Sequence, residues 1–241
     1  MAGQQPAEAD AVSLWFNPPG EANTTRRALT RERVVAEGLT VISAEGAQAL
    51  SMRALAARLG VVPGALYRHV RNKEQLYDLI LDAVLAEVDS QVDPAQPWTA
   101  QIAALAHRLR SVLEDRPGVA ALLKIRDPLS PASLALAEAF LAPLLAAGLS
   151  GPEAAAAFRL IYDYTLGFAV ADPTSPAEQR LRDAASREQL RAFLRALPVS
   201  RFPALAAHGI HAWSADRDQR FAFGLATLLR GLEAVQRPRV S

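Results

Sequence analysis

The sequence predicts an all-α protein in which a small head of short helices precedes a larger helical body. None of the 241 residues fall in a sustained alternation of apolar and polar side chains, which is the pattern of a strand. The chain is rich in alanine and leucine, which favour helices. Its hydrophobic fraction of 51% is ample for a core. The absence of cysteine excludes disulfides, thiolate metal sites and cysteine nucleophiles.

The first predicted helix starts after Thr30, whose side-chain oxygen can accept a hydrogen bond from a free N–H group of the first turn. Its apolar residues recur at helical spacing and are Val34, Val35, Leu39 and Ile42. Gly46 is expected to end it, because glycine closes a helix without strain. Residues 1–25 contain three acids, no base and the pair Pro18-Pro19, and we expect a flexible N-terminal arm there.

A second, short helix is predicted after Ser51, which is another residue type that caps helices. Leu55 and Leu59 stand four apart and are expected to face inward, and Gly60 is expected to end the helix. The run Gly60-Val61-Val62 then separates it from a third helix, so that the second helix can brace the third.

The third helix begins at Pro63, where proline is tolerated because a first-turn N–H has no intrahelical partner. Leu66 and Val70 stand four apart and can anchor this helix to a core. The residues that then face outward are Gly64, Ala65, Tyr67 and Arg68. Two short helices joined by a tight turn fit the helix-turn-helix arrangement, in which the second helix enters the major groove of DNA.

The distribution of charge supports a polyanion as the partner of this head. Although the net charge is only +1, the segment 24–73 carries nine bases and three acids. The arm carries −3 and residues 74–241 carry −2, so the positive charge is local. We therefore predict a three-helix DNA-binding domain over 26–72, with a merely solvated basic face as the alternative. The residues expected to contact DNA are Ser51, Met52, Arg53, Pro63, Gly64, Ala65, Tyr67, Arg68, His69 and Lys73.

A fourth helix is predicted after Asn72, which can cap it, and is expected to stop near Asp93-Pro94. Its apolar residues follow the spacing of an amphipathic helix and are Leu76, Leu79, Ile80, Ala83, Val84 and Val88. Because this helix starts in the head and ends in the body, we expect it to connect a ligand site to DNA binding.

The body, residues 73–241, is predicted to hold five or six further helices beyond Trp98. The expected breaks are at 116–118, 127–128, 148–152 and 172–173. Two of these helices, 153–171 and 216–236, carry large apolar residues on more than one face and must be covered on most sides. We expect a four-helix interface built from these two helices of each of two subunits. The alternative is that both are interior to a monomer.

Two runs in the head are Ser51-Met-Arg-Ala-Leu-Ala-Ala-Arg-Leu-Gly-Val and Leu66-Tyr-Arg-His-Val-Arg-Asn-Lys73. They resemble the DNA-binding region of the tetracycline-repressor (TetR) family of bacterial transcription regulators, from Thr30 to about Asp89. The body is similar to the C-terminal domain of the tetracycline-repressor type through Pro97-Trp98, Asp115-Arg116-Pro117-Gly118, Thr165-Leu166-Gly167-Phe168 and Phe223-Gly224-Leu225. The resemblance implies a homodimer that binds double-stranded operator DNA as a regulator, most simply a repressor, and is released by a small-molecule effector.

A ligand pocket is expected in the body, which would then be a ligand-binding and dimerisation domain. Aromatic bulk with a few polar groups is typical of small-molecule cavities. The candidate wall residues are Trp98, His107, Arg126, Phe140, Arg159, Tyr162, Asp163, Tyr164 and Phe168. Each could instead be a core residue, and Arg159 and Asp163, four apart on one helix, could form an internal ion pair.

The resemblance raises the question of whether tetracycline itself is the effector. In that repressor the drug is bound as a magnesium chelate, and the place of the metal-ligating histidine falls here on Asp115. The later acidic partner falls at Pro152 or Glu153. We therefore expect a different effector, bulky and partly apolar, and neither a metal nor a cofactor.

No nucleotide-binding glycine loop, phosphate loop or Gly-x-Ser-x-Gly pattern occurs, so we predict that the protein is not an enzyme. The alternative is an all-helical enzyme or small-molecule-binding protein with a basic N-terminal appendage. The longest charge-free apolar stretch lies between Glu138 and Glu153, and Pro143 and Gly148 interrupt it, which excludes a membrane span. With no signal peptide either, a cytoplasmic location is expected.

Overall fold

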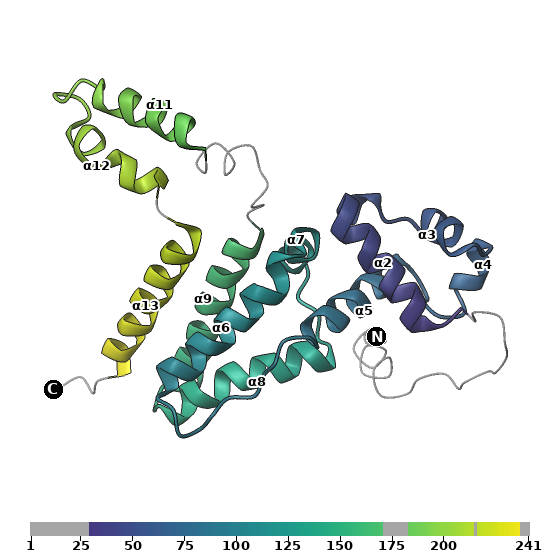
Figure 1. The fold of residues 1–241 in the computed structure, drawn as a ribbon. Helices are drawn as coiled ribbons and strands as arrows, with labels where there is room; N and C mark the ends of the chain where they lie inside the picture. Colours follow the sequence, from purple (N-terminus) through teal and green to yellow (C-terminus); the bar gives the residue numbers. More distant parts are fainter. Residues whose placement is uncertain (1–28, 171–182, 215, 237–241) are drawn as a thin grey trace, which may run out of the picture.

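The computed structural model of the protein describes residues 29–170, 183–214 and 216–236 (Figure 1). Every regular element within these residues is a helix, which confirms the all-α prediction. The arm predicted at 1–25 lies outside the described residues.

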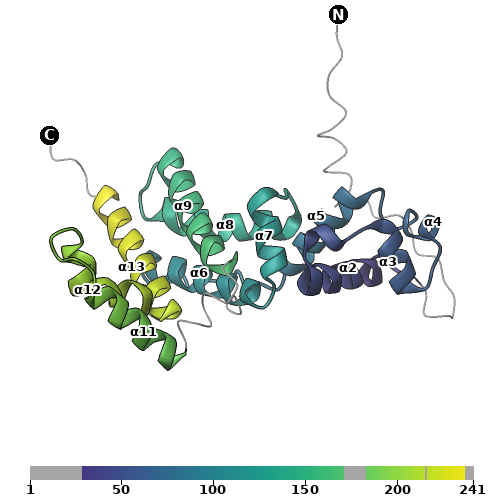
Figure 2. The same ribbon diagram turned by 90° about the horizontal axis from the view of Figure 1, so that it is seen from above.

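The helices form a head, which is made of α2 to α4, and a body, which is made of α6 to α9 and α13. They are joined by α5, which was counted with the body in the prediction from the sequence. Their bounds are α2 (Arg31–Glu45), the short 3₁₀ helix η1 (Ala47–Ala49), α3 (Met52–Leu59), α4 (Pro63–Leu66), α5 (Lys73–Leu85), α6 (Trp98–Glu114), α7 (Pro117–Ile125), α8 (Pro131–Ala146), α9 (Gly151–Val170), α11 (Ala184–Arg195), α12 (Pro203–Ser214) and α13 (Arg217–Gln236). Figure 2 shows the head at one end of an elongated molecule and α13 toward the other.

The predicted caps of the head are confirmed. The side chains of Thr30, Ser51 and Asn72 each accept a hydrogen bond from the backbone N–H three residues on, at 3.2, 3.1 and 2.8 Å. Gly46 and Gly60 end α2 and α3 with positive φ angles of 82° and 69°. Glycine is favoured at both, because a Cβ is strained in that region of backbone conformation. The start and end of these helices are therefore set by residues next to them in sequence.

α5 differs from its prediction in length. It ends at Leu85 and not near Asp93-Pro94. After it, the backbone hydrogen bonds span three residues, as in a 3₁₀ turn, where those of an α-helix span four. Glu87 donates to the carbonyl of Val84 at 3.2 Å and Val88 to that of Leu85 at 3.1 Å. Val88 is buried as its spacing predicted, but it lies in a turn after the helix and not in the helix itself.

α5 also differs in which residues it buries. Ala83, predicted to face the core, is exposed, whereas Tyr77 and Leu81, outside the predicted set, are buried. The reason is that α5 packs against α2 in the head and against α6 and α8 in the body, so that it is covered on more than one side. A single apolar stripe does not describe a helix with several neighbours.

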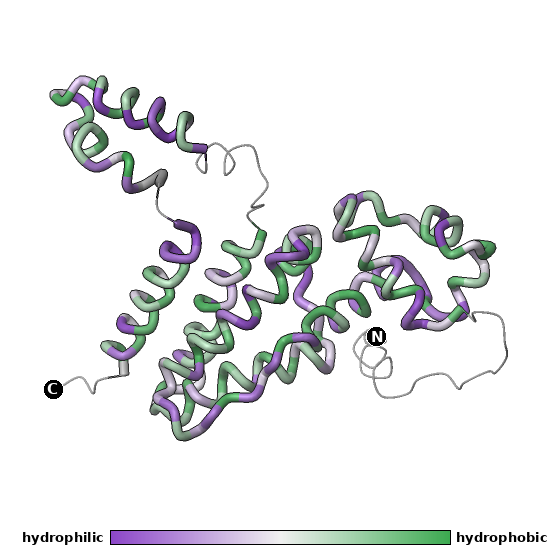
Figure 3. Tube along the Cα trace, viewed as in Figure 1, coloured by the Kyte–Doolittle hydropathy of each residue, from purple (hydrophilic) through white to green (hydrophobic). Residues whose placement is uncertain are grey.

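The described residues beyond α5 hold seven helices where five or six were expected. The additional break lies in the segment that forms α11 and α12, which pack on each other as a hairpin set apart from the body in Figure 1. The side chain of Leu194 in α11 lies against Gly209 in α12, so close that a Cβ there would be 3.0 Å from it. Figure 3 shows hydrophobic residues along much of α5, α8 and α9 and hydrophilic ones along much of α11.

The core of the body forms where α6, α7 and α8 all pack against α9. Phe140 of α8 and Phe221 of α13 are its largest fully buried side chains. The head joins this core through α2, which packs on α7. Gly118 makes that contact possible, because a Cβ on it would lie 2.3 Å from the backbone oxygen of Ile42. Within the described residues, none of the helices has the length and apolarity that crossing a membrane requires.

Candidate nucleic-acid interface and effector region

α4, the helix predicted to enter the major groove, spans only Pro63–Leu66 and does not reach Val70 as expected, but the side chains on it and in the turn after it face as predicted. Leu66 and Val70 are fully buried, whereas the side chain of Tyr67 is 54% exposed and Arg68 is also exposed. Backbone hydrogen bonds from His69 and Val70 to the carbonyl of Leu66, at 2.9 and 3.0 Å, continue the helical turn past Leu66. One face of this turn is therefore anchored in the head and the other is offered to solvent.

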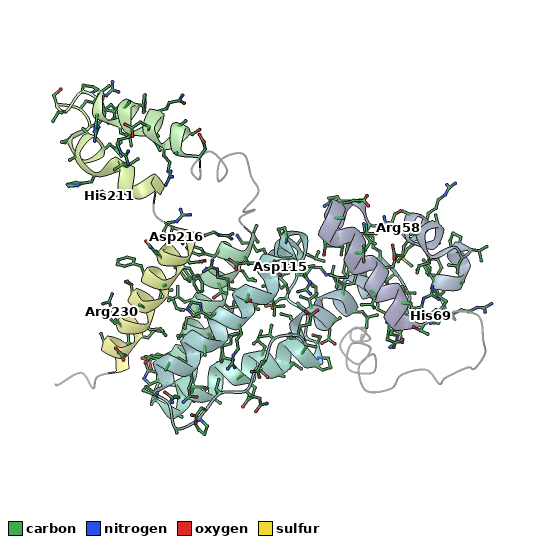
Figure 4. The ribbon with its side chains drawn as sticks, viewed as in Figure 1. Arg58, His69, Asp115, His211, Asp216 and Arg230 are labelled. Carbon is green, nitrogen blue, oxygen red and sulfur yellow. The ribbon has the colours of Figure 1, made fainter. Side chains whose placement is uncertain are left out.

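The other residues expected at DNA lie in α4 and the turn after it, at the start of α3 and, in the case of the half-buried Lys73, at the start of α5. Pro63 and Gly64 are exposed, and Ala65 and His69 are half-buried. In Figure 4, His69 lies at the edge of the head remote from α13. At the start of α3, Arg53 is exposed and Met52 half-buried. The N–H groups at the start of α3 suit a phosphate oxygen, because they carry the positive end of the helix dipole.

Three residues outside the predicted set hold this surface in place. Arg31 donates from Nε to the backbone carbonyl of His69 at 3.3 Å. Gln75 accepts a short hydrogen bond from the backbone N–H of Arg71. The hydroxyl of Tyr77 donates to the backbone oxygen of Ala47 at 2.7 Å. A signal for Gln75 is present in the sequence, since an Asn cap followed three residues later by Gln is a variant of the capping box.

Part of the basic charge of the head is neutralised within the head. Arg58 pairs with Glu37 at 2.5 Å and with Glu45 at 3.2 Å, across α2 and α3. The hydrogen bond to Glu37 raises the pKa of the Arg58 guanidinium. This pairing fixes α3 on α2, while Arg53 and Arg68 remain on the exposed face.

The candidate effector residues fall into separate groups. Phe140 and Tyr162 lie together through the ring of Phe158, with centroid distances of 5.7 and 5.6 Å. The guanidinium of Arg159 lies 5.4 Å from the centroid of the Tyr162 ring, and Arg159 also pairs with Asp163 at 3.0 Å. The internal ion pair considered for these two residues is therefore present.

Tyr162 is the most perturbed titratable group of this cluster. Burial raises the pKa of its phenol to about 12. The charge of Asp127 acts in the same direction, and that of Arg159 opposes it. The phenol therefore stays protonated and can serve only as a neutral hydrogen-bonding group.

A second group surrounds Phe221 of α13. The rings of Tyr164, Phe168 and His107 lie 5.4, 5.3 and 5.1 Å from its ring, centroid to centroid. Tyr164 and Tyr162 are two residues apart on α9 and so point to nearly opposite sides of that helix, which keeps the two groups apart. The Tyr164 hydroxyl donates to the backbone oxygen of Phe221 at 2.9 Å, so it helps to fasten α13 to α9.

Arg110 belongs to this second group although the sequence did not single it out. Its side chain is only 6% exposed, and its guanidinium lies 4.5 Å from the Phe221 ring centroid. Glu114 pairs with it at 2.6 Å, and Asp218 also pairs with it. The spacing of Arg110 and Glu114, four apart on one helix, was a signal that could have identified the first pair.

The remaining two candidates lie elsewhere. Trp98 is half-buried at the start of α6. Arg126, just after α7, pairs with Glu74 and with Asp78 on α5. Burial opposes the charge of Arg126, but the hydrogen bonds and charges of Asp78 and Glu74 outweigh it and raise its pKa. The nine predicted residues therefore do not form one continuous wall.

Two positions bear on the question of a bound metal. Asp115 is the exposed C-terminal cap of α6. The carboxylate of Glu153 accepts hydrogen bonds from the backbone N–H and hydroxyl of Ser150, at 2.9 and 2.7 Å. In the part of the chain that the structure describes, no group of three or more His, Asp and Glu side chains is placed to hold a metal ion.

A three-helix head that exposes an aromatic and basic turn, attached to a larger helical body, defines a helix-turn-helix transcription regulator. The chain belongs to the TetR family. Residues 34–80 match the family described as bacterial regulatory proteins of the tetR family, and residues 92–236 match the tetracyclin repressor-like C-terminal domain.

Named relatives agree with this assignment. An HTH-type transcriptional regulator of Saccharopolyspora erythraea is 33% identical over 95% of this chain and 94% of its own length. The HTH-type transcriptional repressor DrrR1 of Streptomyces coeruleorubidus is 31% identical over 92% of this chain and 84% of its own. The solved structure of the Streptomyces coelicolor TetR family protein ActR in complex with actinorhodin is similar with a TM-score of 0.76, 31% identity and coverage of 87% of this chain and 99% of ActR. The chain is thus a DNA-binding transcription regulator, and the alternative of an enzyme with a basic appendage was wrong.

Proposed function

We propose that the protein is a cytoplasmic repressor that binds operator DNA as a homodimer and is released by a small, partly apolar effector. In this proposal residues 26–72 form the DNA-binding domain and residues 73–241 the ligand-binding and dimerisation domain. The observation that carries it is that α4 and the turn after it have a buried side, with Leu66 and Val70, and an exposed side, with Tyr67 and Arg68. The relative DrrR1 is itself named a repressor.

A homodimer is supported by apolar side chains that the single chain leaves exposed. Leu160 of α9 is 46% exposed, and Phe223 and Val235 of α13 are 72% and 55% exposed. Burying a large apolar side chain stabilises an interface by about 1.5 to 3 kcal/mol, so two such helices from each chain suit a four-helix interface. Two reading helices would then address two half-sites about one helical turn apart.

An effector of mixed character is supported by the cluster of Phe140, Phe158 and Tyr162, which has Arg159 and Asp163 at its exposed edge. A ligand releases DNA only if it binds the released conformation more tightly than the DNA-bound one. A hundred-fold loss of DNA affinity requires about 2.7 kcal/mol of such preference. The structural neighbour ActR is seen in complex with actinorhodin, which supports an effector site in the same kind of body.

The test is a selection from a pool of duplexes with a random central segment at low ionic strength, followed by footprinting. The expected outcome is one enriched sequence with two-fold symmetry, bound by two chains. If no sequence is enriched over its frequency in the starting pool, the result would count against the proposal. A panel of aromatic small molecules is then screened for loss of the mobility shift on the enriched duplex, and no displacement by any member would leave repression without an inducer.

A further inference from the structure

An acidic row on α5 holds the connector between α7 and α8. Glu74, Asp78 and Asp82 succeed one another at intervals of four residues, so they lie along one face of the helix. Arg126 donates to Glu74 and, from Nη2 and Nε, to Asp78 at 2.7 and 3.2 Å. Asp82 accepts a hydrogen bond at 2.9 Å from the backbone N–H of Ala132, at the start of α8.

The same part of α5 also contacts the surface of the head that is proposed to bind DNA. Asn72 caps α5, and Gln75 accepts the backbone N–H of Arg71, in the turn that follows α4. Tyr77 lies between the two sets of contacts. Its ring centroid is 5.7 Å from the guanidinium of Arg126, and its hydroxyl bonds the η1 turn that precedes α3. Moving Arg126 relative to the head would therefore disturb contacts that orient both helices of the DNA-binding motif.

The far side of the connector is tied to the proposed effector region. Asp127, next to Arg126, pairs with Arg159 of α9 at 3.1 Å. Arg159 in turn lies over Tyr162, whose neighbour in the aromatic cluster is Phe158. A continuous series of contacts thus runs from the aromatic cluster through two adjacent residues of the connector to the first turns of α5.

We propose that Arg126 is a positioning residue for DNA binding, which through Glu74 and Asp78 sets the position of the head relative to the body. The proposal rests on the proposed function, since it names the residue by which the effector region controls the reading helix. Arginine suits the role because its planar fork bonds two carboxylates at once. A lysine offers a single point charge and would reach one carboxylate at a time.

The structure supplies a matched control for the general loss of an ion pair. The side chain of Arg116 is as exposed as that of Arg126, at 25%. It pairs with Glu87 at 2.9 Å, beyond the opposite end of α5 from the reading turn. Removing Arg116 therefore removes a similar pair without removing the contact to Glu74 and Asp78.

The experiment measures two quantities for Arg126→Ala, Arg126→Lys and Arg116→Ala. The first is affinity for the duplex enriched in the random-pool selection. The second is the distance between spin labels on Ala44→Cys in the head and Ala142→Cys in α8, both exposed positions, with labelled chains diluted into unlabelled ones. Because the chain has no cysteine of its own, labelling is specific to these sites.

Arg126→Ala is expected to weaken DNA binding about ten-fold and to broaden the distance distribution, because two charge-assisted contacts are lost. Arg126→Lys should lie between it and the wild type, and Arg116→Ala should leave both quantities unchanged. The charge-reversed double variant, Arg126→Glu with Asp78→Arg, should recover part of the DNA affinity that is lost in Arg126→Ala. If Arg126→Ala does not fold, Arg126→Lys and the reversed pair decide the matter.

Equal effects of Arg126→Ala and Arg116→Ala, or an unchanged distance distribution in the Arg126 variants, would overturn the role of Arg126. The distance measurement needs neither DNA nor a dimer. A wild-type chain that binds no duplex would therefore refute the proposed function while the distances still decide whether Arg126 positions the head.

Discussion

The head and the body each contain a helix that begins with Pro-Gly, and the two pairs serve different purposes. In the head, Gly64 follows Pro63 at the start of α4, and apart from its chain neighbours and the backbone of its own helix, nothing among the described residues lies within 4 Å of where its Cβ would be. In the body, Gly118 follows Pro117 at the start of α7, and its Cβ would lie 2.3 Å from the backbone oxygen of Ile42. The same dipeptide leaves open space beside one helix and lets two helices touch at the other.

The exposed apolar residues of the two regions show a similar contrast. Val62 in the head and Phe223 in the body are both 72% exposed. Val62 directly precedes α4, and the exposed residues Tyr67 and Arg68 directly follow it, whereas Phe223 lies on α13 with Val235. The two side chains are equally exposed, but their neighbours differ. Aromatic and basic neighbours suit a polyanion in the head, whereas apolar neighbours suit another protein chain in the body.

The largest effect is expected when a side chain is placed in the close contact between α7 and α2. Gly118→Ala should destabilise the protein by about 3 kcal/mol, because a backbone oxygen cannot move aside as a flexible side chain can. Gly64→Ala, the matched change in α4, should leave the free energy of unfolding within about 0.5 kcal/mol of the wild type. Urea unfolding followed by circular dichroism measures both. Similar losses in the two variants would show that the Pro-Gly pairs do not differ as described.

The next effect tests the surface of α13. Phe223→Ser should weaken dimerisation by about 2 kcal/mol, or roughly 30-fold in the dissociation constant, because a large apolar contact is lost. Val62→Ser removes an equally exposed apolar side chain from the head and should leave dimerisation unchanged. Sedimentation equilibrium gives the monomer fraction of each. A Phe223→Ser protein as dimeric as the wild type would remove α13 from the interface.

Within the head, Arg68 and Lys73 are expected to act differently on DNA. Arg68→Ala should relax preference at one base pair by about 1 to 3 kcal/mol, because the residue is exposed on the reading turn. Lys73→Ala should weaken all sequences alike and reduce the slope of log affinity against log salt by about one unit. Binding to single-substituted duplexes at several salt concentrations separates the two, and an unaltered sequence preference in Arg68→Ala would mean that α4 lies in the groove in another orientation.

The smallest effect concerns the buried phenol of Tyr162 in the body. The pKa of this group is 10.0 without perturbation and about 12 in the folded protein, so between these values the unfolded chain has released a proton that the folded chain retains. Stability therefore falls as pH rises through this interval. Tyr162→Phe has no phenol to titrate at this position. As pH rises from about 9 to about 11, its free energy of unfolding should increase by about 1 kcal/mol relative to that of the wild type. If the free energies of unfolding of the two proteins, measured across that range, change with pH in the same way, the phenol is not buried.

In the head, residues adjacent in sequence decide where the helices begin and which side of α4 and its following turn is buried, and the sequence was sufficient for these features. Thr30, Ser51 and Asn72 cap the helices that follow them, and Leu66 and Val70 are buried as their spacing indicates. Capping and helical periodicity act over three or four residues, so they can be recognised without knowing the fold. The exposure of Tyr67 and Arg68 follows from the same periodicity.

In the body, tertiary structure decided what periodicity could not. Arg110 reaches Asp218 across 108 positions of the chain, and Arg126 reaches Glu74 across 52. Ala83 was placed on the wrong side of α5, because the burial of a helix depends on how many neighbours surround it. By itself, the sequence determined an all-α fold and a basic helix-turn-helix head from interactions within a turn. Which side chains of α5, α9 and α13 meet was decided only by packing between distant segments, because contacts of that kind leave no regular spacing in the sequence.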